Sequence, residues 1–579
     1  MKINFLNKAA FVFGLALLAA WNAPAEEKCT ACHQEEQRFS PFHDPRQIGC
    51  VVCHGGNGAS NIETIAHQKM EAYPGRIASA ASSCGQSNCH PKLIPLAENS
   101  IMQTLNGMIE VTREAFQEEK PLDRHLSAEQ RLSETGADSY LRKLCVSCHL
   151  GSERQNHQQT LRDRGGGCSA CHLETFKFEK NQTGIKSKAD PGSSSVIRDK
   201  VHPRLTVRIH NDRCFGCHSR SSRISLNYVG LAEVEEMDLT QHSDFGYLPD
   251  RRLVEKQKAD LHSLAGMACI DCHTVSGLMG TGVPVTRHRQ QLDIQCSDCH
   301  QTVLQKKPAG TLTMREAIYP ALYPAQYYVS KQGEVVVTEK QKTPLFHIQE
   351  DGELRVLQKK LNGEKIEIPP MRQSGHHSLK GHERLSCDSC HAAWAPQCYG
   401  CHISYEAKGM QWDHLKRKKT PGRWVEKRWR LENKLPALGV TKNNKIAPFV
   451  PGMNMILEKN PGAVPVVQVR YSQISPHTTQ KKGRSCQSCH QNDAALGIIG
   501  EWAVSPQNPS WQVPVGWIEK GADFPGKAVQ NGARSLNQEE IQRISRVGAC
   551  LQCHLPQDPV YQDFEKALPY LHKQQTNSK

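Results

Sequence analysis

Apolar positions recur with a helical period in two segments of the chain. Residues 97–119 place apolar side chains on one helical face, and residues 537–572 repeat the pattern before the last histidine-containing motif. The apolar positions are Ile101, Met102, Leu105, Met108, Ile109 and Phe116 in the first segment, and Ile541, Ile544, Val547 and Leu551 in the second. Both segments are therefore predicted to be amphipathic helices.

A period of two marks the strands. Residues 327–338, 353–357 and 364–368 alternate apolar and polar positions, and an X-Gly dipeptide (332–333, 351–352 and 362–363) stands at each expected turn. Residues 301–386 are thus predicted to form a small antiparallel β insert. Residues 466–471, which follow Pro465, are predicted to form one further strand.

Most of the chain has neither pattern. Only 38% of its residues are hydrophobic, against roughly 45–50% in ordinary globular proteins. A conventional apolar core for 579 residues is therefore lacking, and something other than side chains must supply the missing apolar surface.

The cysteines supply the strongest signal. All 24 fall into twelve pairs, and a histidine directly follows the second cysteine of each pair. Eleven pairs are Cys-x-x-Cys-His; the twelfth has four residues between its cysteines. The pairs are Cys29 and Cys32, Cys50 and Cys53, Cys84 and Cys89, Cys145 and Cys148, Cys168 and Cys171, Cys214 and Cys217, Cys269 and Cys272, Cys296 and Cys299, Cys387 and Cys390, Cys398 and Cys401, Cys486 and Cys489, and Cys550 and Cys553.

Disulfides, zinc sites and redox-active thiols do not require a histidine at that position. Cys-x-x-Cys-His is the signature of covalent c-type haem attachment, in which both thiols bond the porphyrin and the histidine binds its iron. Twelve haems are therefore predicted, with proximal ligands His33, His54, His90, His149, His172, His218, His273, His300, His391, His402, His490 and His554. The motifs at Cys387 and Cys398 start eleven residues apart, so their haems should nearly touch.

These motifs resemble those of the multihaem c-type cytochromes of bacterial respiratory electron transfer, here with twelve haems. The resemblance rests on short motifs spread along the chain and does not identify a subfamily. It implies a multihaem cytochrome architecture: mainly α-helix and irregular coil organised around twelve covalently bound haems, with the small antiparallel β insert.

Sixteen further histidines could bind the sixth position of the irons. The candidates are His43, His67, His125, His157, His202, His210, His242, His262, His288, His347, His377, His382, His414 and His477. His376 and His377 are expected to supply one ligand between them, and His572 is the expected spare. A haem with two histidines has no open position, and histidine in place of methionine gives a lower potential.

The first 25 residues predict a secretory signal peptide. Lys2 and Lys8 precede an apolar run, and Ala23-Pro24-Ala25 is a small-residue cleavage site. The run is shorter than the roughly 20 residues that span a bilayer. We therefore expect a periplasmic protein without a transmembrane segment in the mature chain; the outer-membrane surface and the cell exterior are alternatives.

Motif spacing divides the rest of the chain. We expect a five-haem region at 26–190, a three-haem region at 191–300, the haem-free insert at 301–386 and a four-haem region at 387–579. The last contains a haem-free stretch at 403–485, whose 416–430 segment interleaves basic and aromatic residues. Because haem propionates are acidic, much of the formal charge of +14 is expected to pair with them, and no nucleic-acid partner is expected.

Two functions follow as hypotheses. The first is electron relay along mostly bis-histidine haems in anaerobic or extracellular respiration. Its partners would be a quinol dehydrogenase, other cytochromes, an outer-membrane conduit or a terminal reductase. The second is a multihaem oxidoreductase with one open-site haem, acting on hydroxylamine or on a nitrogen or sulfur oxyanion; no catalytic residue is assigned.

Overall fold

The computed structural model places the chain in two compact units, residues 1–95 with 165–209 (unit 1) and residues 96–164 with 210–579 (unit 2). The structure describes residues 27–33, 39–118, 123–153, 165–174, 202–219, 224–234, 245–248, 252–318, 327–371 except 353, 377, 379, 381–431, 435–460, 464–473, 475–498, 502–505, 508–514, 527–529, 532–555, 558 and 561. The predicted signal peptide lies outside these residues.

Unit 1 is built from single helical turns. They include α2 (Cys29–Cys32), α4 (Val51–His54), α5 (Glu63–Ala66), α6 (Ile77–Ala80) and α12 (Ser169–His172). Its two segments are joined by backbone bonds: the Cys168 amide donates to the Gly75 carbonyl at 2.7 Å. Gly167 has φ +60°, and a Cβ there would lie 2.3 Å from the Gly75 oxygen, so this approach requires glycine.

The helix predicted at 97–119 is present as three pieces. They are α7 (Ile94–Asn99), α8 (Ile101–Thr104) and α9 (Asn106–Ala115). The breaks fall at Ser100, whose hydroxyl accepts the Gln103 amide as a helix cap, and at Leu105, which has the left-handed φ of +50°. The apolar period survives both breaks, because Leu105 and Ile109 pack in one buried cluster.

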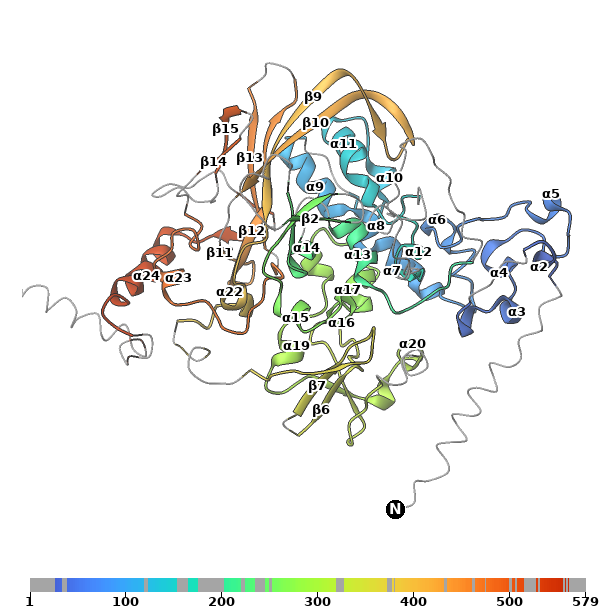
Figure 1. Ribbon diagram of the computed structural model, residues 1–579, viewed down its shortest axis with the longest axis horizontal. Helices are drawn as coiled ribbons and strands as arrows, with labels where there is room; N and C mark the ends of the chain where they lie inside the picture. Colours follow the sequence, from blue (N-terminus) through green and yellow to red (C-terminus); the bar gives the residue numbers. More distant parts are fainter. Residues whose placement is uncertain are drawn as a thin grey trace, which may run out of the picture. The chain divides into compact units, whose positions relative to one another are not determined.

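A seven-stranded sheet dominates unit 2 (Figure 1). Its path is β10-β9-β12-β11-β17, and β13 joins β12 to β16. The bounds are β9 Cys398–Asp413, β10 Lys418–Leu431, β11 Ala437–Val440, β12 Ile446–Glu458, β13 Val466–Gln473, β16 Lys527–Ala528 and β17 Arg534–Ser535. Strands β9 and β10 form a long antiparallel hairpin, and β12 runs parallel to β9.

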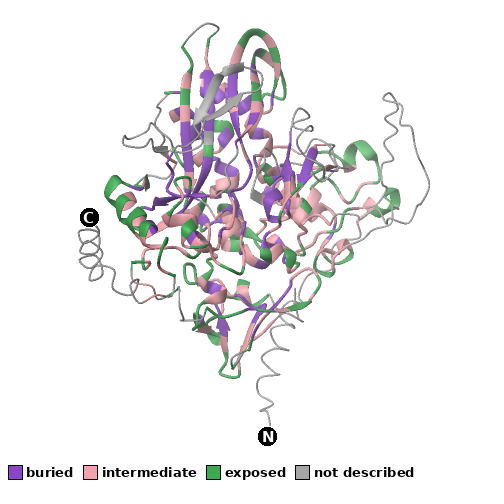
Figure 2. Ribbon diagram, turned by 60° about the vertical axis from the view of Figure 1, so that its left-hand side comes forward, coloured by how far each residue is buried: buried purple, intermediate pink, exposed green. Residues whose placement is uncertain are grey.

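The sheet packs against the helices α9 and α11 (Gly136–Tyr140). Ile403, Trp424 and Leu457 from the strands meet Phe116, which caps α9, and Tyr140 of α11. Buried residues are drawn purple in Figure 2 and include long stretches of the strands. Of these strands only β13 was predicted from the sequence. Strands β9 and β10 escaped prediction because charged residues interrupt their alternation, so the β structure exceeds the expected small insert.

The predicted insert is confirmed as antiparallel. Strands β6 (Ile348–Asp351), β7 (Leu354–Gln358) and β8 (Lys365–Glu367) form one sheet, and β4 (Lys306–Pro308) pairs with β5 (Glu334–Val336). Two further sheets were not predicted. They are β1 (Leu231–Glu233) with β3 (Leu253–Lys256) and β2 (Phe245–Tyr247), and β14 (Trp502–Ser505) with β15 (Asn508–Pro514).

The second predicted helix is α24 (Gln538–Cys550), which covers the described part of that prediction up to the first cysteine of the last motif. Asn537 caps it and forms a capping box with Glu540. Among the helices of the described residues, none has both the length and the apolar character needed to span a bilayer.

Candidate metal centres

Each motif is named below by its first cysteine. In eight motifs the histidine amide donates to the carbonyl of that first cysteine, at 2.8–3.0 Å. In the Cys214 and Cys387 motifs the five residues lie inside helices α13 (Asn211–His218) and α22 (Cys387–His391). The Cys145 motif ends on a single turn of 3-10 helix, Val146–Cys148. Ten motifs are thus compact helical turns, and the longer Cys84 motif is a wider turn closed by the bond from His90 to Cys84; all eleven bring their two thiols together.

Seven motif histidines face a second histidine. The pairs are His33 with His67, His90 with His43, His54 with His202, His300 with His262, His273 with His477, His391 with His377, and His490 with His382. All seven ring-centre separations lie between 6.0 and 6.3 Å. Every pair joins one motif histidine to one of the histidines predicted as distal ligands.

That separation fits a shared metal. Metal–imidazole bonds of about 2 Å, with roughly 1 Å from each nitrogen to its ring centre, place two rings on one metal about 6 Å apart. Aromatic rings in contact also have their centres about 4.5–7 Å apart, so the argument rests on the distance together with the partners: every pair joins a motif histidine to a second histidine. The chain therefore holds seven pairs of rings at the distance that an iron between them requires.

Five motif histidines are oriented for binding through Nε2. Because a carbonyl only accepts, Nδ1 must donate to it, and Nε2 is left as the ligand nitrogen. The Nδ1 contacts of 2.8–3.0 Å are His54 to Glu71, His172 to Thr206, His300 to Pro369, His391 to Gln480 and His490 to Ile544, all to backbone oxygens.

Burial keeps several of these rings neutral, which metal binding requires. Burial is the largest cause that lowers the pKa of His273 to about 4, followed by the charge of His477. The pKa of His288 also falls to about 4, first through burial and then through Arg289.

Neighbouring motifs touch through their thiols. In unit 1, hydrogen-bond contacts join Cys29 to Cys50 and Cys84 to Cys168. Between these contacts, burial and the charges of Cys84 and Cys89 raise the pKa of Cys53 to about 11. The four motifs of unit 1 therefore form one continuous series, in the order Cys29, Cys50, Cys84 and Cys168.

Unit 2 contains a longer series of the same kind. The Cys217 thiol contacts the Cys148 carbonyl at 3.6 Å, and hydrogen bonds between thiols join Cys214 to Cys269 and Cys296 to Cys387. Two further links are electrostatic: after burial, the charge of Cys299 raises the pKa of Cys272 and the charge of Cys489 raises the pKa of Cys390. In the Cys214, Cys269, Cys296 and Cys387 motifs, the first cysteine faces one neighbouring motif and the second faces the other. At the far end, His490 donates to Ile544 of α24, which carries the Cys550 motif. A cavity of about 550 Å³ opens there, lined by His490 and Gly548 among others.

The last motifs of the two series are those of Cys168 in unit 1 and Cys550 in unit 2. In each, the helical turn of the motif itself positions the second cysteine. In unit 1 the Cys171 amide donates to the Cys168 carbonyl at 3.3 Å. In unit 2 the Cys553 amide donates to the Cys550 carbonyl at 3.1 Å, and Cys553 is exposed to solvent. Neither Cys171 nor Cys553 forms a disulfide. The turn geometry suits two thiols on one porphyrin, and haem attachment stays a prediction at these motifs as at all the others.

The Cys398 motif differs in conformation. It forms the start of β9, a central strand paired with both β10 and β12. Successive residues of a strand point to opposite faces, so Cys401 packs with Ile403 toward the helices while Cys398 and His402 belong to the other face. The His402 Nε2 lies 3.2 Å from the Glu458 carboxylate. In this conformation the motif does not fit a porphyrin held by both thiols.

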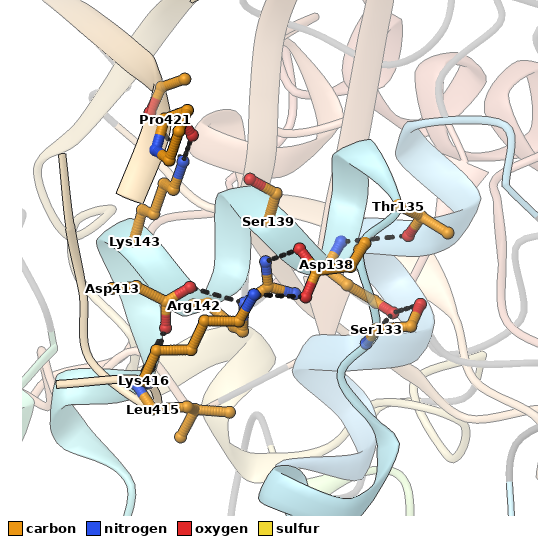
Figure 3. Close-up of polar contacts among 12 residues, drawn as sticks. Ser133, Thr135, Asp138, Ser139, Arg142, Lys143, Asp413, Leu415, Lys416 and Pro421 are labelled. Carbon is orange, nitrogen blue, oxygen red and sulfur yellow. Dashed lines mark hydrogen bonds and ion pairs between the residues drawn. The ribbon is translucent and has the colours of Figure 1, made fainter. Parts of the chain in front are cut away.

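The Cys145 motif is anchored to the sheet by buried ion pairs (Figure 3). Arg142 binds Asp413 at 2.8 Å, and Lys143 donates to the carbonyls of Pro421 and Gly422. Asp138, one helical turn earlier, binds Arg113 at 2.8 Å. Burial raises the pKa of Asp138, but the Arg113 and Ser133 hydrogen bonds outweigh it and leave that pKa below its ordinary value.

His149 itself is fully buried, and both of its ring nitrogens face oxygens. Nδ1 lies 2.9 Å from the Glu129 carboxylate, and Nε2 contacts the Gln103 carbonyl. Burial raises the pKa of Glu129, yet the hydrogen bond and the charge of His149, together with hydrogen bonds from the backbone and Ser127, outweigh this and lower the pKa to about 2.

The remaining predicted distal ligands fall into three groups. His347 is buried with Nε2 2.9 Å from the Asp271 carbonyl, so it faces backbone and not a motif histidine. Four others have other positions: His125 is exposed, His210 is the N-cap of α13, His288 begins α18 (His288–Gln291), and the His414 amide donates to the Arg142 carbonyl at 3.0 Å. His157, His242, His376 and His572 lie outside the described residues.

Sequence reasoning missed the carboxylates at these rings. Glu129 and Glu458 reach His149 and His402 from 20 and 56 residues away, and no local pattern marks them. Asp260 could have been found, because it stands two residues before His262 and contacts its Nδ1 at 2.9 Å. Comparisons with protein-family models, curated proteins and solved structures give no match.

Proposed function

We propose that the protein is a multihaem c-type cytochrome that relays electrons through haems held along its two series of motifs. The observation that carries this proposal is the set of seven histidine pairs, 6.0–6.3 Å apart, each with one motif histidine. Ordinary core histidines have no reason to pair in this way.

The chain's own residues would do three things. The cysteines would hold each haem covalently, the paired histidines would close both axial positions, and the backbone carbonyls on Nδ1 would fix each ring. When bound, haem iron supplies one-electron redox chemistry. A ring fixed through Nδ1 needs little rearrangement when the charge on the metal changes.

The thiol contacts give this relay an order. Because the cysteines of each motif lie near those of the next, the centres that they hold would be nearest neighbours. Unit 1 would carry four centres in series. Unit 2 would carry seven, from the Cys145 motif through Cys214, Cys269, Cys296, Cys387 and Cys486 to Cys550. The Cys398 motif stands outside both series.

Periplasmic location and redox-protein partners belong to the same proposal. They rest on the sequence: a signal peptide, and haem motifs of the kind found in respiratory cytochromes. An oxidoreductase acting on hydroxylamine or a nitrogen or sulfur oxyanion is the second candidate, because His149 is held differently from the paired histidines.

The test is intact mass and optical spectroscopy of the secreted protein. We expect the mass of the chain plus at least eleven covalent haems, and spectra dominated by low-spin, bis-histidine centres. The pair Cys269→Ser/Cys272→Ser should remove one haem mass, whereas Ser276→Ala nearby should remove none. A folded, colourless protein with the mass of its amino acids alone would refute the proposal.

A further inference from the structure

Asp260 is a buried carboxylate that contacts one of the paired histidines. It caps the helix α15 (Leu261–Leu264), where its side chain accepts the His262 amide at 2.8 Å. The same oxygen lies 2.9 Å from the His262 Nδ1, and the other oxygen accepts the Thr479 amide at 2.6 Å. Asp260 is 1% exposed, so three N–H donors surround a carboxylate that is shielded from solvent. Such a set of donors stabilises the ionised form of the carboxylate.

This contact leaves the second nitrogen of the His262 ring for iron. Nδ1 must donate, because an ionised carboxylate only accepts, and Nε2 is then the ligand nitrogen. The ring of His300 is arranged in the same way, with Nδ1 2.8 Å from the Pro369 carbonyl. The two ring centres lie 6.1 Å apart. The residues of this pair therefore fit an iron bound between two Nε2 atoms.

The charge of the Asp260 carboxylate distinguishes His262 from other rings of the seven pairs. Six of those rings direct Nδ1 to a neutral oxygen, either a backbone carbonyl or the Ser40 hydroxyl: His43, His54, His300, His391, His477 and His490. Carboxylates also reach Nδ1 of His149 and His554, but neither ring belongs to the seven pairs. A carboxylate on the outer nitrogen makes imidazole a more basic ligand and fixes its orientation. A more basic ligand favours ferric over ferrous iron, so the reduction potential falls.

The segment 477–480 places Asp260 inside the unit 2 series. His477 pairs with the motif histidine of the preceding centre. Thr479 binds Asp260, and the Gln480 carbonyl accepts the Nδ1 of the motif histidine in the following centre at 3.0 Å. One short segment therefore contacts the ligands of three consecutive centres, those of the Cys269, Cys296 and Cys387 motifs.

We propose that Asp260 is a positioning residue that lowers the reduction potential of the Cys296 centre, the fourth of the seven in the unit 2 series. The inference rests on haem attachment and bis-histidine ligation as proposed above. Asp260 acts on the iron through the Nδ1–H of His262. Electrons that travel along the series would then pass through a centre whose affinity for them is set by a buried carboxylate.

Redox titration of the purified holoprotein, followed optically, tests this proposal. Asp260→Asn removes the charge but keeps a residue that caps helices. Loss of the carboxylate should weaken the preference for ferric iron by about tenfold, which raises the potential of one centre by about 59 mV for a single electron. The matched control is Asp298→Asn in the same motif. Asp298 is 4% exposed and accepts the backbone amides of Gln295 and Glu339 at 2.7 and 2.8 Å, so its loss should shift the potential far less.

A second comparison asks whether Asp260 acts through the ring. In His262→Met the sixth ligand is no longer imidazole, and the potential of this centre should rise, which also identifies it among the other haems. Adding Asp260→Asn to His262→Met should then have no more effect than adding Asp298→Asn, because the ring that transmits the charge is absent.

Two results would overturn the inference while leaving the relay intact. One is an Asp260→Asn protein whose potentials match those of the wild type. The other is a shift of the same size in the presence of His262→Met. If Asp260→Asn does not accumulate, Asp260→Ser, which also caps helices without the charge, decides by the same titration. A secreted protein without haem mass would instead refute the proposed function itself.

Discussion

Unit 1 and the sheet of unit 2 reach compactness by opposite means. Among the described residues of unit 1, the buried apolar side chains are Ala80 and Ile94. The sheet and its helices bury Phe116, Trp424 and Leu457 with their neighbours in one cluster. A unit with so little buried apolar surface cannot offset the entropy of ordering its chain. Unit 1 should therefore depend on haem for its core, while the sheet should not.

The largest effect is expected from removing a haem of unit 1. Cys50→Ser/Cys53→Ser should abolish the native structure of that unit, a loss as large as the roughly 5–15 kcal/mol that stabilises a whole domain. Limited proteolysis with mass spectrometry should then show rapid cleavage within residues 27–95, while the sheet stays resistant.

Cys398→Ser/Cys401→Ser is the matched control, since it makes the same chemical change inside β9. We expect the sheet to keep its protease resistance, because its core consists of side chains. The contrast between the units is contradicted if unit 1 stays protease-resistant in Cys50→Ser/Cys53→Ser, or if the sheet becomes sensitive in Cys398→Ser/Cys401→Ser.

The sheet should instead be sensitive to its aromatic core. Trp424 is 4% exposed and packs edge-on against Phe116 and Tyr140. Trp424→Ala should cost about 3–5 kcal/mol, as large-to-small core substitutions do. Thermal unfolding followed by far-UV circular dichroism measures the loss. Trp412→Ala on the neighbouring strand is the control: Trp412 is 40% exposed, and the change should stay within about 0.5 kcal/mol.

A buried ion pair should make the helix layer sensitive to acid. Asp138 is fully buried against Arg113, and its pKa in the folded protein is below the ordinary value. Such a carboxyl stabilises the fold at pH values above its unfolded pKa of about 3.9, and this contribution is lost as the pH falls through the folded pKa. Asp138→Asn should cost about 3 kcal/mol at pH 7.

Urea unfolding at pH 7 and at pH 3 checks this expectation. The difference between the wild type and Asp138→Asn should shrink at the lower pH. Glu134→Gln, at an exposed ion pair, should change stability by less than about 1 kcal/mol at either pH. A difference that is independent of pH would contradict the assignment.

Local pattern was enough to predict some of this molecule. The twelve motifs could be identified because each occupies five to seven consecutive residues. The insert strands and α24 were predictable because their apolar periods are regular. His67, His202 and His477 were predicted as ligands by type alone; their partners His33, His54 and His273 are set by tertiary contacts 34, 148 and 204 residues away.

The conformation of the Cys398 motif could not be predicted. Its five residues match the other motifs, yet β10 and β12 pair with both sides of it and make it a strand. The polar environment of His149 could not be predicted either, because Glu129 and Gln103 reach the ring from two separate helices, α10 (Ala128–Arg131) and α8. In both places tertiary structure decides what a repeated local motif becomes.

The smallest change in stability, and the sharpest test of the comparison, should come from removing one distal histidine in each unit. His67→Ala in unit 1 and His477→Ala in unit 2 should each create one high-spin centre, visible in the optical and paramagnetic resonance spectra, because each removes an imidazole 6.0 or 6.2 Å from a motif histidine. His125→Ala, at an exposed histidine, should leave the spectra unchanged.

The His67→Ala and His477→Ala variants should differ in proteolysis. His67→Ala should make residues 27–95 accessible to protease, since an iron–imidazole bond there helps to hold a unit with almost no apolar core. His477→Ala should leave unit 2 resistant. Equal proteolysis in the two variants would show that unit 1 has a source of stability other than its haems.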